Sequence, residues 1–141
     1  MMKKYLPAIA LLFVAGGFGR VGGQTVTNLH SFGAYTTDGA QPRAGLVQGT
    51  NGYFYSTTFE GGTNHYGMVF GINSQGTLTN LWSFNGLDGK NSSAALALGN
   101  DGNFYGTTVN GGTNGFGAVF MLSPQGTFSN LWHFNGTNGG E

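Results

Sequence analysis

The sequence is organised by an internal repeat whose two full copies are spaced by 50 residues. Residues 45–91 and 95–141 are identical at 24 of 47 aligned positions. The segment TVTNLHSF at 25–32 is a partial third copy, which resembles TLTNLWSF at 77–84 and is displaced from it by 52 residues. A fixed period of this length is the sequence signature of a repeat architecture.

Each full copy predicts four short strands, rich in the aromatic residues and Thr that suit a pleated surface. The dipeptides Asn51-Gly52 and Asp101-Gly102 predict two-residue type I′ hairpin turns, in which both residues have positive φ. The predicted strands lie at 44–49, 53–59, 67–73 and 77–84 in the first copy, and at 94–99, 103–109, 117–123 and 127–134 in the second.

Four antiparallel strands in each repeat of about 50 residues are typical of a β-propeller blade. The sequence therefore predicts an all-β, β-propeller-like fold with two four-stranded antiparallel blades and an extra leading strand at 25–32. Because closed propellers usually contain about 4–8 blades, the prediction is an incomplete propeller. A flat or helical β-solenoid is the competing architecture.

Two explanations of the low number of blades stay open, beside an open or incomplete fold. The reading frame is truncated after Glu141, inside the link toward a further unit. Alternatively, complete short chains form a homo-oligomer by head-to-tail contacts, and closure of the ring then removes the exposed strand edges.

The first residues follow the three-part pattern of an export signal. Lys3 and Lys4 precede a short apolar run, which is followed by the small residues before Gln24. We therefore expect a signal peptide at 1–23 and a secreted or extracytoplasmic bacterial protein, with an uncleaved anchor as the alternative. The apolar run of the leader is shorter than the roughly 20 residues that cross a bilayer. The mature chain is likewise expected to have no transmembrane span.

The remainder, 24–141, is predicted to be one β-propeller-like repeat domain. Its first repeat covers 25–76, its second covers 77–126, and 127–141 begins a third.

The composition excludes several classes of function. The chain has 5 basic residues and a formal net charge of zero, which gives no positive field for nucleic acid. It has no cysteine, so disulfides, thiolate chemistry and lipoprotein anchoring are excluded. Its 28 glycines do not follow the strict period of collagen. We expect no cofactor.

The stretch GNDGNFYGTTVNGGTNGFGAVF at 99–120 contains the most distinctive motif of the chain. Together with the following VF-x-L and F positions it resembles the bacterial GloVer tandem repeat, and the resemblance covers about 25–141. The first repeat departs from it only in detail, with Ser56 in place of Gly106 and His65 in place of Gly115. The resemblance implies an exported, repetitive β protein, often with a C-terminal surface-sorting anchor, and supplies no active-site residues.

Four aromatic residues are the candidate binding site. Tyr66 and Phe116 lie in the GGTN links, and Trp82 and Trp132 lie in the fourth predicted strands. Aromatic rings stack on sugar rings, and neighbouring Asn and Thr can bond hydroxyl groups, so these positions predict weak multivalent glycan binding. The alternative is that the four side chains pack inside the fold.

No catalytic residue and no metal ligand is predicted. Asp38 and Asp88 lie in equivalent links, where a pair of carboxylates could serve glycosidic chemistry, but repeated acids in loops are more often solvated. Asp101 lies in a segment similar to a calcium loop that lacks the full ligand pattern, so a turn is expected there.

The sequence thus favours a non-enzymatic binding or adhesion scaffold at the cell surface, with polysaccharide or a surface glycan as its partner. The alternative is a fragment of an extracytoplasmic glycan-active hydrolase or lyase of propeller fold.

Overall fold

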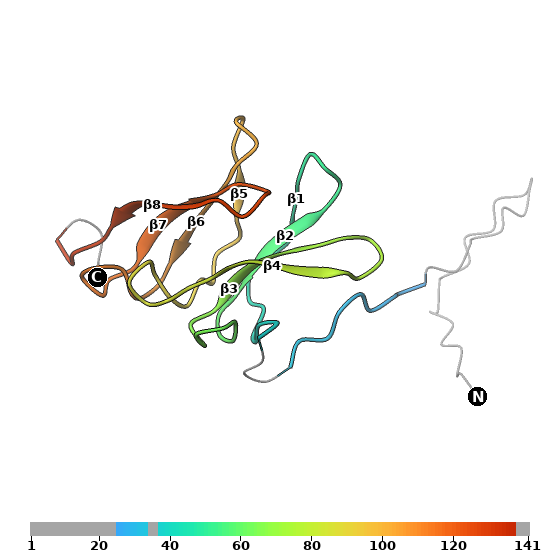
Figure 1. The fold of residues 1–141 in the computed structure, drawn as a ribbon, viewed down its shortest axis with the longest axis horizontal. Coiled ribbons are helices and arrows are strands. Elements are labelled where there is room, and N and C mark those ends of the chain that lie inside the picture. The colour runs from blue at the N-terminus through green and yellow to red at the C-terminus, as the bar shows by residue number, and fades with distance from the viewer. Residues whose placement is uncertain (1–24, 34–36, 138–141) are drawn as a thin grey trace, which may run out of the picture.

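The computed structural model describes residues 25–33 and 37–137, and its secondary structure is entirely β (Figure 1). Two four-stranded antiparallel sheets follow one another along the chain, each with its strands in sequence order. The first sheet consists of β1 (Val47–Gln48), β2 (Phe54–Thr58), β3 (Met68–Ile72) and β4 (Leu78–Ser83). The second consists of β5 (Ala97–Leu98), β6 (Phe104–Thr108), β7 (Ala118–Leu122) and β8 (Phe128–His133).

The prediction of an all-β fold with two four-stranded antiparallel sheets is confirmed, and the arrangement is consistent with an incomplete propeller. The expected signal peptide at 1–23 lies outside the described residues. Among the residues that are described, none belongs to a helix capable of crossing a membrane.

The two sheets share one register. Val69 pairs with Trp82 and Val119 with Trp132, and in both sheets the register then shifts before the next pair. The shift leaves an extra unpaired residue, Leu81 or Leu131, in a bulge of the fourth strand. Because a bulge sets two residues against one, Leu81 and Trp82 both contribute to the same hydrophobic cluster although they are consecutive.

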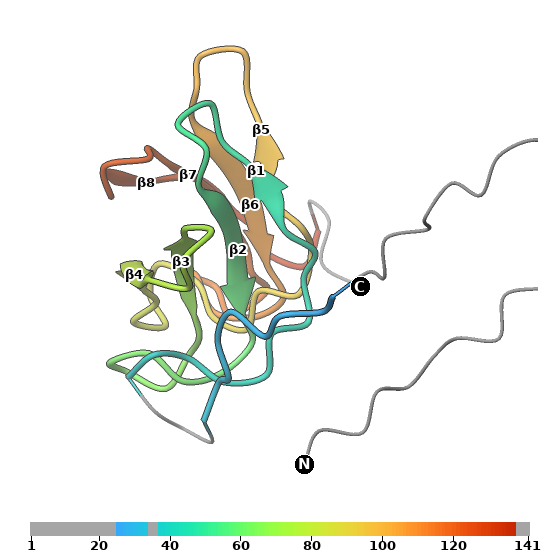
Figure 2. The same ribbon diagram turned by 90° about the vertical axis from the view of Figure 1, so that its right-hand side faces the viewer.

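Aromatic rings hold the sheets together face to face. Trp82 stacks on Phe128 with ring centroids 4.4 Å apart and an interplanar angle of 4°. Tyr55 lies 4.1 Å from Phe104, and Phe84 meets Phe120 edge-on at 5.3 Å. Each such pair adds about 0.5–1.5 kcal/mol beyond the area that it buries. The short strands β1 and β5 lie side by side, as do β2 and β6 (Figure 2).

The type I′ prediction for the hairpin turns is wrong. Gly52 has a φ of 82° and Gly102 a φ of 79°, but Asn51 and Asp101 do not have positive φ. The amide of Gly49 donates to Tyr53 O at 2.9 Å, which closes a three-residue loop whose last residue is the left-handed glycine. The side chain of Asn51 instead accepts a hydrogen bond from the Tyr53 amide at 3.2 Å.

The prediction of an extra leading strand at 25–32 is also wrong, because residues 25–33 have no strand pairing. They nevertheless lie on the first sheet as β4 lies on the second, on the side away from the second sheet (Figure 2). Phe32 meets Phe70 at 5.2 Å, where Phe84 meets Phe120 at 5.3 Å. In each full repeat the fourth strand pairs with the third strand of its own sheet, and in the described chain this segment has no such partner.

The link between second and third strands requires glycine at one position of each repeat. Gly67 and Gly117 have φ values of 92° and 93°. A Cβ atom on Gly117 would lie 2.2 Å from Thr108 O, and one on Gly67 would lie 2.3 Å from Thr58 O. The chain therefore turns back directly over its own backbone at these positions.

We expect Gly117→Ala to destabilise the protein by more than the roughly 1–2 kcal/mol that a left-handed alanine costs, because its methyl group also strikes backbone. Gly102→Ala is the matched control, with a φ of 79° and nothing within 4 Å of the new Cβ atom. Urea denaturation of both variants gives the two free energies of unfolding. Equal losses would contradict the close approach at Gly117.

Candidate functional site

The loops at one end of the two sheets are joined into a continuous rim. The amide of Asn91 donates to Tyr66 O at 2.9 Å, and the amide of Gly112 donates to Gly86 O at 2.9 Å. Lys90 and Asn110 form an isolated antiparallel bridge. The link 85–91 is thus bonded to the loop on either side of it. We call residues 59–67, 85–91 and 109–117 the loop rim.

Tyr66 and Phe116 occupy equivalent places in this rim and remain open to solvent. Their side chains belong to residues that are 41% and 50% exposed, respectively. Each ring lies close to a glycine of the following turn, since a Cβ atom on Gly86 would be 3.4 Å from the Tyr66 ring and one on Gly136 would be 3.2 Å from the Phe116 ring. The two repeats therefore present an aromatic ring in the same setting.

Polar residues lie beside both rings. The Thr-Asn pair before each ring is exposed in both repeats, at 63–64 and 113–114. Asn64 donates through Nδ2 to Phe84 O at 3.1 Å, which fixes its side chain against the end of β4. Lys90 Nζ lies 5.6 Å from the centroid of the Tyr66 ring, at the distance of a cation–π contact.

The tryptophans lie on sheet faces and not in the loop rim. Trp82 of β4 is half-buried between the sheets, where it stacks on Phe128. Trp132 of β8 is its counterpart and is 53% exposed. The structure thus brings Tyr66 and Phe116 into one rim. It places Trp82 and Trp132 on the equivalent strands β4 and β8, where Trp82 packs between the sheets and Trp132 is exposed.

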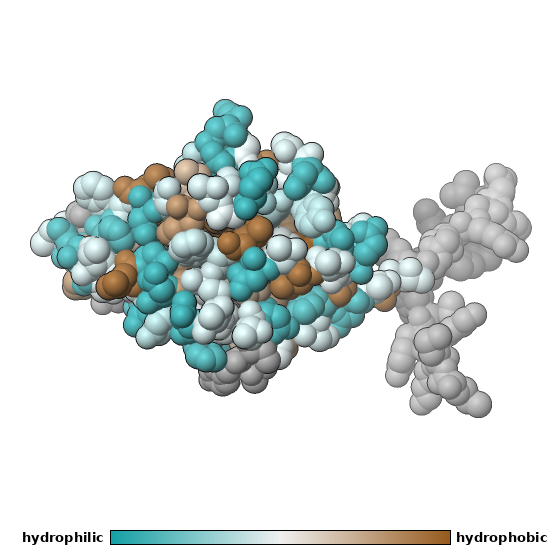
Figure 3. Space-filling view, in the orientation of Figure 1, coloured by the Kyte–Doolittle hydropathy of each residue, from teal (hydrophilic) through white to brown (hydrophobic). Residues whose placement is uncertain are grey.

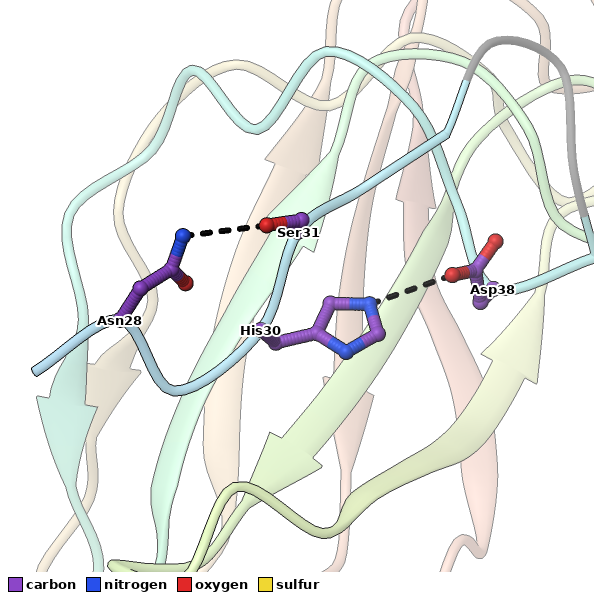
Figure 4. Close-up of polar contacts among 4 residues, drawn as sticks. All are labelled: Asn28, His30, Ser31 and Asp38. Atoms are coloured by element: carbon purple, nitrogen blue, oxygen red, sulfur yellow. Dashed lines mark hydrogen bonds and ion pairs between the residues drawn. The ribbon is translucent and has the colours of Figure 1, made fainter. Parts of the chain in front are cut away.

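Asp88 and Asp38 each contact an aromatic side chain of the preceding segment, Trp82 or its aligned counterpart His30. Trp82 Nε1 donates to Asp88 Oδ2 at 3.0 Å, and His30 Nε2 lies 3.1 Å from Asp38 Oδ2 in the same relation (Figure 4). Asp88 is only 8% exposed, and it also accepts the Asn85 amide at 2.9 Å. Sequence reasoning missed this contact, although the repeat alignment puts each aspartate a few residues after its aromatic partner.

The Asp101 segment has the geometry of a turn. The carboxylate of Asp101 accepts hydrogen bonds from Tyr105 OH at 2.7 Å, from Asn103 Nδ2 at 2.8 Å and from the Asn103 amide at 3.1 Å. The bond from Tyr105, followed by those from Asn103, lowers the pKa of Asp101. In the first repeat, Asn51 Nδ2 donates to Tyr55 OH at 2.8 Å, so the same aromatic anchor serves an uncharged residue.

The described residues contain no group of three His, Cys, Asp or Glu side chains able to hold a metal ion. On the face shown in Figure 3, apolar residues lie singly or in small groups among hydrophilic ones. The functional candidates on the rim are therefore individual rings.

The sequence model of the Gloeobacter/Verrucomicrobia repeat matches residues 19–141, so the chain belongs to this family of repeat proteins. The match confirms the resemblance that the repeat motif carried. A sequence search of curated proteins gave no match to the chain.

The bond from Tyr105 predicts a specific pH response. We expect the pKa of Asp101 to lie below the usual aspartate range and to rise in Tyr105→Phe, because the phenol stabilises the charged carboxylate. The stability that this bond contributes is present above the pKa of an unfolded aspartate and is lost as pH falls through the lowered value. Carboxyl NMR titration of both proteins measures the pKa. An unchanged Asp101 pKa in Tyr105→Phe would contradict the assignment.

Proposed function

We propose that this chain is an exported, non-enzymatic binding scaffold that holds glycan chains at the loop rim. The observation that carries the proposal is the recurrence of an exposed aromatic ring, Tyr66 and Phe116, at the same place in two repeats. A buried role does not account for these rings, since about half of each residue remains in solvent in both repeats.

The chemistry of the rim suits a saccharide. The C–H face of a pyranose ring lies flat on an aromatic ring, and its hydroxyl groups accept and donate hydrogen bonds at the edge. Thr63 and Asn64 beside Tyr66, with their counterparts beside Phe116, supply such polar groups. One exposed ring gives weak binding, but two sites on one scaffold gain affinity when a polymer spans both.

The polar contacts of the acids support a scaffold in preference to a glycan-active enzyme. Glycoside hydrolysis requires two carboxylates on either side of the bond, about 5–10 Å apart. Asp88 is buried and accepts hydrogen bonds from Trp82 and Asn85, which is a structural use of the group. Asp38 stands in the equivalent relation to His30 in the preceding link.

We expect Tyr66→Ala and Phe116→Ala each to weaken binding to a retained polysaccharide by about tenfold or more, since each variant loses bivalency. The double variant is expected to lose binding. Affinity electrophoresis in gels containing soluble polysaccharides, with pull-down on cellulose, chitin and peptidoglycan, gives the measurement. Leu87→Ala is the matched control, because Leu87 is a 73% exposed apolar residue of the same rim that has no ring.

Binding that survives in the double variant would move the site away from the rim. Failure of the unchanged protein to bind any of these polymers would overturn the glycan proposal.

The leader sequence supports the export part of the proposal. When the full chain is expressed in a bacterial host, we expect the protein recovered outside the cytoplasm to begin at Gln24. Amino-terminal sequencing of that fraction tests this, and retention of the whole chain in the cytoplasm would contradict it.

A further inference from the structure

Comparison of the repeats reveals one sheet face that is covered in the first sheet and uncovered in the second. In the first sheet, Tyr55 is 2% exposed and Val69 0% exposed, because the second sheet lies on them. Their counterparts in the second sheet, Tyr105 and Val119, are only half-buried. Leu131 is 50% exposed and Trp132 53% exposed, whereas the equivalent Leu81 and Trp82 of the first sheet are half-buried. We call this surface the outer face; it consists of Tyr105, Val119, Leu131, Trp132 and Phe134.

The first sheet also carries an apolar surface like the one with which the second sheet covers it. The second sheet covers the first with Phe104, Phe120 and Phe128. At the same register positions the first sheet carries Phe54, Phe70 and Leu78, which gather in a separate cluster on its other side. We call these three residues the receiving face.

Part of the receiving side is open as well. Leu46 is 58% exposed, whereas its counterpart Leu96 is 5% exposed and lies in the core between the sheets. Residues 25–33 lie over the remainder, and two of their own apolar residues stay in water, with Val26 99% exposed and Leu29 41% exposed. Within the described residues, both ends of the two-sheet stack therefore leave apolar side chains in water at positions that are buried or half-buried at the internal interface.

Residues 25–33 lie where the strand β8 of another copy would fit. Phe32 contacts Phe70 as Phe84 contacts Phe120, and Phe134 is the next residue of this series. His30 meets Asp38 as Trp82 meets Asp88, and Trp132 is the corresponding residue of β8. The segment makes these contacts without any strand ladder, so fewer hydrogen bonds hold it than hold β4.

We propose that copies of this chain associate head to tail, with the outer face of one copy packed on the receiving face of the next. The strand β8 then replaces residues 25–33 on that face. Trp132 lies against Leu78 of the next copy and donates to its Asp38, as Trp82 does with Phe128 and Asp88 inside one chain. No residue of the two faces is charged, so association brings no like charges together. This proposal does not depend on glycan binding.

Sedimentation velocity over a wide concentration range tests the proposal on the whole mature chain. We expect the mass of the unchanged protein to rise with concentration in multiples of one chain. Trp132→Asp places a charge at the centre of the outer face and is expected to weaken association by at least a hundredfold. Leu87→Asp is the matched control, because it adds the same charge at a 73% exposed residue in a loop, and it is expected to associate normally.

A second variant tests the competition on the receiving face. Phe32→Ala removes the main contact of residues 25–33 with Phe70, so we expect association to tighten severalfold. If that variant does not fold, as judged by circular dichroism, His30→Ala removes the contact with Asp38 instead. Tryptophan emission should shift to the blue with concentration in Trp82→Phe, in which Trp132 is the remaining tryptophan.

A single-chain mass at every concentration overturns the proposal, as does association of Trp132→Asp that equals that of the unchanged protein. Weaker association of the variants that loosen residues 25–33 also overturns it. A single-chain mass with a blue-shifted Trp132 would mean that the chain covers its own outer face, which contradicts the second copy as occupant.

Discussion

The structure depends on the contact between two sheets that are apolar on both sides. A four-stranded sheet with two apolar faces cannot shield them from water by itself, so each face gains stability when another layer covers it. Here Phe120 is fully buried and lies within ring contact of Phe84 and Phe128, which come from different sheets. The repeat spacing, the shared register and the shared bulge all serve to reproduce this one contact surface.

That constraint explains where glycine and polar side chains occur. Strands packed on both faces have little polar surface. Thr58 and Thr108 satisfy their buried hydroxyls locally by accepting hydrogen bonds from the amides of Met68 and Ala118, whereas the buried hydroxyl of Thr57 has no hydrogen-bond partner within the described chain. The links must reverse the chain over its own backbone, which selects glycine at Gly67 and Gly117. Exposed side chains that could bind a ligand are consequently concentrated in the loops.

Sequence reasoning succeeded where the repeat itself carried the information. Two aligned copies predicted the four strands of each sheet, because a strand pattern that arises by chance in one copy would not recur at the same positions in the other. It failed where the outcome depends on a partner or on a neighbouring turn. Residues 25–32 have the sequence of a fourth strand, but a strand needs a ladder that the described chain does not offer. The Asn-Gly and Asp-Gly dipeptides fit two hairpin geometries, and the cross-strand bond from Gly49 to Tyr53 selects the longer one.

Comparison between the repeats also separates two causes of exposure that could not be distinguished in a single repeat. Trp132 is exposed while Trp82 stacks on Phe128, so the exposure of Trp132 reflects the absence of a covering layer in the described residues. Tyr66 and Phe116 are exposed in both repeats, including the one whose sheet is covered. Their exposure therefore does not follow from missing neighbours in the described residues. The proposed glycan at the loop rim would account for these two rings, and the proposed second copy would account for Trp132.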